Sequence, residues 1–187
     1  MKKSLGAKTL IVPTPVWCVG SYDNKGAPNV MTIAWGGICC SKPPCVTISL
    51  RKATYTYGNI MNRQAYTLNV PSDKYFREVD YFGLVSGRNV NKFEETGLTP
   101  VKSDLVEAPY VGEFPMILEC KVIHHHELGL HTQFVGEILD TKIDESMLND
   151  EGKPDIKTIR PFVFSPGTQQ YHSIGEFIGK AFEVGKK

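Results

Sequence analysis

Short apolar runs separated by turn residues constrain the fold of this chain more than any other feature. Their spacing predicts strands over residues 15–22, 29–35, 45–50, 66–70, 117–126, 131–143 and 162–164. Short helices are expected at residues 56–62, after Ser72, and at residues 91–96 before Gly97. About six strands with few helices, and no regular alternation of the two, favour a mainly β fold: a closed or split Greek-key barrel.

The segment after the last strand has an apolar helical face. Residues 174–182 would place five apolar side chains on one side of a helix, although Gly175 and Gly179 weaken that helix. The five are Ile174, Phe177, Ile178, Ala181 and Phe182. We expect this tail either to pack on its own barrel or to dock onto a partner subunit.

Composition limits the classes of partner. A length of 187 residues with 41% apolar content suits a single domain over residues 1–187. The net charge of +1 gives no general attraction to nucleic acid or to an anionic membrane. Five cysteines, an odd number that includes the adjacent Cys39 and Cys40, favour free thiols in a reducing compartment. We therefore expect a cytoplasmic protein, without a signal peptide or a membrane span.

Two basic loops are candidates for phosphate binding, since the chain has neither a G-x-G-x-x-G nor a G-x-x-x-x-G-K-[ST] motif. Ser49-Leu50-Arg51-Lys52-Ala53-Thr54 leads from a predicted strand into a predicted helix, whose N-terminus attracts anions. The second loop is Ser86-Gly87-Arg88-Asn89-Val90-Asn91-Lys92-Phe93, whose small and basic residues come before the next short helix. Taken singly, the first could be a solvated basic loop and the second a capped loop.

The strand at residues 29–35 is a candidate wall for a flat ligand. Its alternation places Asn29, Met31, Ile33 and Trp35 on one face and Val30, Thr32 and Ala34 on the other. A flat heteroaromatic ring needs hydrogen bonds at its edge and an apolar cover, and this strand could supply both. The alternative is an ordinary barrel strand with a core tryptophan.

The histidines and cysteines indicate neither a metal site nor a hydrolase. His124 and His126 share a strand face, but no carboxylate or cysteine follows at the spacing of a zinc site. No Cys-His arrangement and no G-x-S-x-G motif can be identified. His131 alone could face a ligand as a hydrogen-bond donor or proton relay, and it is the one catalytic candidate.

Residues 10–185 resemble the flavin reductase-like family with the FMN-binding split barrel, and within it the flavoredoxins. The resemblance depends on the order and spacing of several short segments. They are Pro13-Thr14-Pro15-Val16, Pro28-Asn29-Val30-Met31-Thr32-Ile33-Ala34-Trp35, Cys40-Ser41-Lys42-Pro43-Pro44, Ser49-Leu50-Arg51, Ser86-Gly87-Arg88, Asn91-Lys92-Phe93, Gly129-Leu130-His131 and Gly136-Glu137.

The resemblance implies noncovalent FMN, a homodimer with sites near the subunit interface, and three groups of cofactor-binding residues. The first group, along the isoalloxazine, is Asn29, Val30, Met31, Thr32, Ile33, Ala34 and Trp35. The second, around the ribityl phosphate, is Ser49, Leu50, Arg51, Lys52, Thr54 and Thr56. The third, which completes the pocket and its mouth, is Ser86, Gly87, Asn91, Lys92, His131 and Phe164.

Three functions are compatible with this resemblance. The first is a flavoredoxin-like carrier that exchanges electrons with redox protein partners through FMN. The second is an NAD(P)H-dependent flavin oxidoreductase, and the third is a nonenzymatic module that stores or senses flavin. Many flavin reductases of the family read Gly-Asp-His where this chain reads Gly129-Leu130-His131. The missing carboxylate favours the carrier over the NAD(P)H enzyme.

Overall fold

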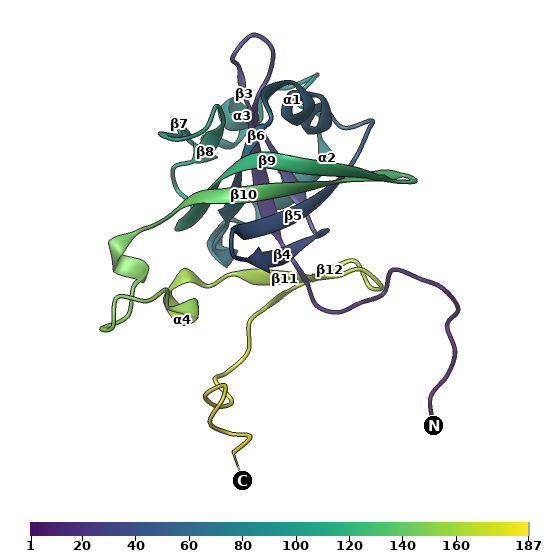
Figure 1. The fold of residues 1–187 in the computed structure, drawn as a ribbon, viewed down its shortest axis with the longest axis vertical. Helices are drawn as coiled ribbons and strands as arrows, with labels where there is room; N and C mark the ends of the chain where they lie inside the picture. The colour runs from purple at the N-terminus through teal and green to yellow at the C-terminus, as the bar shows by residue number, and fades with distance from the viewer. Residues whose placement is uncertain (187) are drawn as a thin grey trace.

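The computed structural model describes residues 1–186 and has a seven-stranded antiparallel sheet at its centre. Its strand order is β3-β2-β6-β9-β10-β5-β4 (Figure 1). The strands are β2 (Trp17–Tyr22), β3 (Pro28–Ile33), β4 (Gly36–Ser41), β5 (Pro44–Arg51), β6 (Ala65–Val70), β9 (Met116–Leu128) and β10 (His131–Ile143).

The sheet curls because its two edge strands are consecutive in the chain. Only Ala34 and Trp35 separate the end of β3 from the start of β4, although these strands lie at opposite edges. The Ser49 N–H of β5 donates to the Trp35 carbonyl at 2.9 Å, which ties the connection to the far side of the sheet. A two-residue connection between the two edge strands, held by this hydrogen bond, requires the sheet to close into a barrel.

Two small sheets and several short helices lie around the barrel. β1 (Thr14–Pro15), β11 (Phe162–Ser165) and β12 (Gln170–Ser173) form one sheet, and β7 (Pro100–Lys102) pairs with β8 (Pro109–Val111). The helices are α1 (Tyr55–Arg63), α2 (Phe76–Leu84), α3 (Lys92–Thr96) and α4 (Ile156–Ile159), with single 3₁₀ turns η1 (Asp73–Tyr75) and η2 (Glu145–Met147). Both terminal segments extend away from the barrel on the side of β11 and β12 (Figure 1).

Two apolar cores hold the layers together. The first unites the inward faces of the barrel strands with Ile60 of α1, and Tyr66 and Phe134 are its largest completely buried side chains. The second joins Val30 of β3 to α2 and α3 through Phe82 and Phe93. Together they fix β3, the start of α1, and the α2–α3 connection relative to one another.

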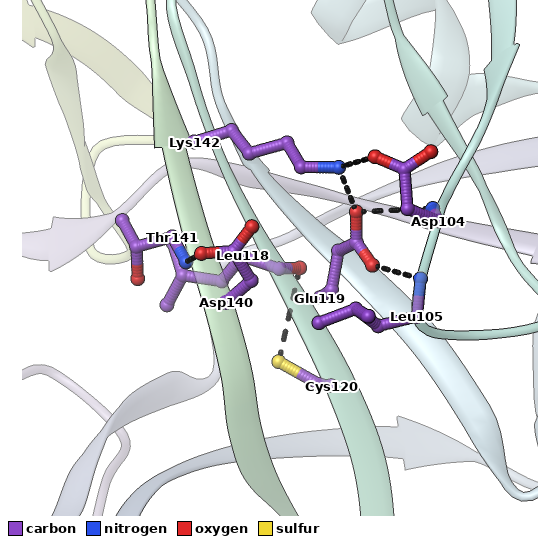
Figure 2. A network of polar contacts seen from close by, with 8 residues as sticks. All are labelled: Asp104, Leu105, Leu118, Glu119, Cys120, Asp140, Thr141 and Lys142. Carbon is purple, nitrogen blue, oxygen red and sulfur yellow. Dashed lines mark hydrogen bonds and ion pairs between the residues drawn. The ribbon is translucent and has the colours of Figure 1, made fainter.

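A buried carboxylate secures β9 to a neighbouring loop. Glu119 is completely buried, and its oxygens accept from the Leu105 N–H at 2.7 Å and the Lys142 Nζ at 2.6 Å (Figure 2). Lys142 also binds Asp104. The carboxylate therefore has a cationic partner and backbone donors, which a buried charge requires.

The mainly β barrel with few helices confirms the predicted fold class. The predicted hairpin at residues 15–35, the long β9–β10 pair and the three short helices are present, but β4 and three other short strands were not predicted. Within residues 1–186, no helix is long and apolar enough to cross a membrane.

The predicted helix at residues 174–182 is wrong. The structure has no helix there, and Phe177, Ile178 and Phe182 are 67%, 99% and 93% exposed. Gly179 has φ of +151°, outside helical values. An apolar helical face needs a surface to bury against, and within the described residues nothing covers Phe177, Ile178 and Phe182.

Candidate functional site

A cavity of about 350 Å³ lies where β3, the start of α1 and the α2–α3 connection meet. The two predicted phosphate loops, which are about 35 residues apart in the sequence, converge on it. Its lining consists of Asn29, Met31, Arg51, Ala53, Thr54, Tyr55, Thr56, Phe82, Gly83, Leu84, Val85, Ser86, Gly87, Arg88 and Lys92. Three of these side chains are cationic, and none is acidic.

The N-terminus of α1 forms one wall of the cavity. Thr54 is its N-cap: the Thr54 Oγ1 accepts from the Tyr57 N–H at 3.3 Å and donates to the Arg51 carbonyl at 2.9 Å. The cap joins the end of β5 to the first turn of α1, so Arg51 and Thr56 line the same cavity. The first turn of a helix carries free N–H groups and a positive potential, which favour an anion.

Lys92 forms the opposite wall and is unusual for a lysine, because it is only 3% exposed. Its Nζ donates to the Phe82 carbonyl at 2.6 Å, near the C-terminal end of α2. Among residues 1–186, no carboxylate lies within ion-pair distance of this ammonium group. Burial lowers the pKa of Lys92 to about 8. A buried cation held only by a neutral carbonyl is a strong point of attraction for an anionic ligand.

Arg88 and Arg51 add two cations at the rim. Arg88 Nη1 donates to the Ala53 carbonyl at 2.9 Å, and its guanidinium lies 5.5 Å from the centre of the Tyr55 ring. Arg88 therefore joins the two basic loops directly. Arg51 is exposed at the end of β5 and lies directly opposite His131 of β10. In the described chain its guanidinium makes no ion pair or hydrogen bond, so it is available to a ligand.

Asn29 supplies an unpaired acceptor at the floor of the cavity. Its Nδ2 donates to Thr56 Oγ1 at 2.9 Å, while its Oδ1 is buried without a hydrogen-bond partner. Gly87 packs directly against this amide, and a Cβ atom at residue 87 would lie 2.1 Å from the Oδ1. Only glycine permits this approach. An unpaired buried acceptor suits a ligand that carries hydroxyl groups.

Eight of the nineteen residues predicted to bind a cofactor line this cavity. They are Asn29, Met31, Arg51, Thr54, Thr56, Ser86, Gly87 and Lys92.

The other predicted residues have different surroundings. Val30, Ile33 and Leu50 are buried in the apolar cores, and Thr32 donates to the Val79 carbonyl. Lys52 pairs with Glu127 at 2.6 Å, on the β9–β10 hairpin. Asn91 caps α3, accepting from the Phe93 N–H at 3.2 Å.

Ala34 and Trp35 line a second, more apolar hollow of about 400 Å³ beneath residues 8–15. Phe164 lies beside this second hollow, because it pairs with Thr14, one of the residues that line it. Ser49 of β5 is joined to the same region through its hydrogen bond to the Trp35 carbonyl. The predicted ring-binding residues thus divide between the two hollows, with Met31 in the first and Trp35 in the second.

Comparison with known proteins identifies the family. Residues 9–171 match the family described as "Flavin reductase like domain". The chain belongs to the flavin reductase-like family. It is also 35% identical to an uncharacterized protein of Archaeoglobus fulgidus over 129 residues, which are 69% of this chain and 72% of the relative.

Solved structures of the flavin reductase-like fold agree with this assignment. The flavoredoxin of Desulfovibrio vulgaris (Miyazaki F) is 55% identical, with 100% of both chains covered and a TM-score of 0.95. The flavoredoxin from Methanosarcina acetivorans is 30% identical, with 100% of this chain and 98% of that chain covered and a TM-score of 0.92. These relatives support flavin binding and a role in electron transfer or flavin reduction, and they confirm the predicted split-barrel fold.

The residues predicted to bind the cofactor omitted several that line the cavity of this family member, although Arg88 belonged to a loop that was a candidate for phosphate binding. Arg88 bridges the two basic loops through the Ala53 carbonyl and the Tyr55 ring, and the Tyr55 hydroxyl donates to Asp23 Oδ2 at 2.9 Å. The C-terminal end of α2, residues 83–85, was also missed. Arg88 could have been found from the second basic loop, whereas nothing in the local sequence signals residues 83–85.

Proposed function

We propose that this protein binds FMN noncovalently and transfers electrons through it as a flavoredoxin-like carrier. One observation carries the proposal: the two basic loops converge on a cavity whose buried Lys92 ammonium has no carboxylate partner in the described chain. A dianionic phosphate supplies the charge that this arrangement lacks.

The residues of the cavity fit a phosphorylated ligand with a hydroxylated chain. The Lys92 ammonium, the Arg51 guanidinium and the start of α1 at Thr54 and Thr56 would hold the phosphate. The unpaired Asn29 Oδ1 would accept a hydrogen bond from a ribityl hydroxyl. Gly87 has no side chain and therefore packs directly against the Asn29 amide.

The ring would lie along β3, toward the second hollow. Met31 lines the first cavity, and Trp35, two residues beyond the end of β3, lines the second, which supports a ring placed between them. His131 and Phe164 would lie near the ring or its mouth. When bound, FMN supplies the electron-transfer chemistry, while the protein sets its access and its electrostatic surroundings.

A second copy of the chain is the partner that we propose at the second hollow. Ile11 and Val12 beside this hollow are 75% and 62% exposed, and the apolar tail is exposed too. A homodimer would cover such surfaces, and light scattering of the purified protein would measure its mass. The free cysteines support a cytoplasmic location.

The visible spectrum of the purified protein, before and after addition of FMN, tests the proposal. We expect a yellow protein, or a colourless one that takes up FMN in equimolar amount. Trp35→Ala should weaken FMN and riboflavin alike, because both ligands carry the ring. A protein that stays colourless with FMN present would refute the proposal.

A second function, NAD(P)H-dependent reduction of flavin, is favoured by one curated relative. The "Ferric-chelate reductase (NAD(P)H)" of Archaeoglobus fulgidus is 25% identical over 104 residues, which are 55% of this chain and 60% of the relative. Leu130, in place of the family's carboxylate, argues against it. A steady-state assay with NADH or NADPH and free FMN separates the two, since rapid turnover would establish the enzyme.

A further inference from the structure

Three of the five free cysteines gather on the β4–β5 hairpin, at the opposite end of β5 from Arg51. Cys39 and Cys40 belong to β4, and Cys45 lies near the start of β5. The other two cysteines, Cys18 and Cys120, are completely buried, and burial raises the pKa of each thiol to about 12. Any thiol chemistry under native conditions therefore belongs to the hairpin.

Cys40 and Cys45 are direct partners across the two antiparallel strands. Direct partners on neighbouring antiparallel strands point to the same face, with Cα atoms about 4.5 or 5.5 Å apart. Disulfides need Cα separations of roughly 4.4–6.8 Å, so this pair can be bridged without moving the backbone.

Cys39 is excluded as the partner of Cys40 by the same geometry. Consecutive Cα atoms are only about 3.8 Å apart, which is shorter than the Cα separation that a disulfide needs. Cys39 also lies at the shift in register between Ile38 and Cys40, where the extra residue of β4 has no partner on β5. The hairpin thus contains one pair of cysteines in bonding position and one that is left over.

The two paired thiols differ in accessibility. Cys40 is exposed on the edge strand β4, whereas Cys45 is only 2% exposed. Burial, followed by the neighbouring Cys40 and Cys39, raises the pKa of the Cys45 thiol. A reagent in solution therefore reaches Cys40 first, and Cys45 reacts only with a group already attached to Cys40.

We propose that Cys40 and Cys45 form a redox-active dithiol that small disulfides oxidise reversibly to a cross-strand disulfide. The Cys40 thiolate attacks one sulfur of a low-molecular-weight disulfide RSSR, forming a mixed disulfide and releasing RS⁻, which is protonated to RSH. The Cys45 sulfur, giving up its proton, then attacks the Cys40 sulfur and displaces the second RSH. Both protein thiols are oxidised, by two electrons in total, and RSSR is reduced to two RSH.

This inference is independent of the proposed flavin function. Cys45 lies six residues before Arg51 along β5, Cys40 lies on β4, and neither cysteine lines the cavity. We expect the oxidised protein to bind FMN with unchanged affinity. Failure of one proposal therefore does not affect the other.

Oxidised glutathione is the probe for the test, with free thiols counted before and after treatment of the full-length protein. In denaturant, the untreated chain should give five thiols and the treated chain three. Trypsin does not cut the Lys42-Pro43 bond, so one peptide, residues 26–51, holds all three hairpin cysteines. After oxidation this peptide should be lighter by two hydrogens and carry no glutathione.

Matched variants identify the pair. Cys39→Ser should behave as the wild type, because its thiol takes no part. Cys40→Ser should lose the two-thiol oxidation, and Cys45→Ser should instead accumulate one glutathione on Cys40. Cys45→Ala serves the same purpose if the buried serine prevents folding.

Three results would overturn the proposal. One is a wild-type chain that keeps all five thiols, and another is a Cys40→Ser chain that still loses two. The third is a disulfide-linked dimer on a nonreducing gel in place of the bridge within one chain.

Discussion

Two lysines of this protein are held in opposite ways. Lys142 binds the buried carboxylate of Glu119 at 2.6 Å and also Asp104, and these ion pairs raise its pKa (Figure 2). Lys92 is buried against the Phe82 carbonyl alone, and burial lowers its pKa to about 8. Lys142 compensates the negative charge of Glu119, which the fold has buried. Lys92 keeps an uncompensated charge at the wall of a cavity, where it can serve a ligand.

The largest effect is expected from removing the structural lysine. Lys142→Met leaves the Glu119 carboxylate buried without its cation, which should lower the free energy of unfolding by about 3 kcal/mol. Urea unfolding followed by circular dichroism measures the loss. Lys153→Met, which breaks an exposed pair with Glu151, is the control and should cost under about 1 kcal/mol. Equal losses for both variants would refute the structural role of Lys142.

Removing the cavity lysine should weaken the binding of a phosphorylated ligand. Lys92→Met should weaken FMN about ten- to a hundredfold, because a charge-assisted hydrogen bond contributes roughly 1.5–3 kcal/mol. Riboflavin, which has no phosphate, should bind the variant and the wild type equally. Fluorescence titration with both ligands measures the difference. An equal loss for riboflavin would place Lys92 away from the phosphate.

The two lysines should also differ in how they couple folding to pH. The pKa of Lys92 is about 8 in the folded chain against 10.5 when unfolded. Between these values the unfolded state binds more protons, so stability rises with pH, by about 2 kcal/mol up to pH 10. Lys142 has a raised pKa, so its contribution is fully present below pH 10.5 and is lost only above that.

Urea unfolding of the ligand-free protein between pH 7 and pH 10 tests this difference. Subtracting the free energy of unfolding of Lys92→Met from that of the wild type removes the contributions of the other titratable groups. This difference should rise from pH 7 to pH 10. A difference that stays flat would show that Lys92 keeps an ordinary pKa.

The smallest expected effect concerns Arg51 and its neighbour. Arg51 is exposed, so Arg51→Gln should weaken FMN less than Lys92→Met does, by about tenfold, and leave riboflavin unaffected. Lys52→Gln is the matched control, because Lys52 pairs with Glu127 and does not line the cavity. A larger loss of FMN affinity for Lys52→Gln than for Arg51→Gln would show that Lys52, and not Arg51, contacts the phosphate.

Much of the barrel could be predicted because its strands and turns are encoded locally. The hairpin at Asp23-Asn24-Lys25-Gly26 and the capped helix α3 were found from their turn and cap residues. Strand β4 was missed because its two glycines have little strand preference, and its pairing with β5 is a tertiary contact. The prediction for the tail failed for the opposite reason: its pattern is helical, but within residues 1–186 no surface covers Phe177, Ile178 and Phe182.

The sequence by itself determined the two basic loops, the apolar alternation of the strands, and the family to which they belong. Only the tertiary structure decided which cations face the cavity: Arg51, Arg88 and Lys92 do, while Lys52, one residue from Arg51, turns to Glu127. Adjacent residues of a strand end point in different directions, so spacing alone cannot choose between them. The burial of Lys92 likewise results from packing between α2 and α3, a contact that no local pattern specifies.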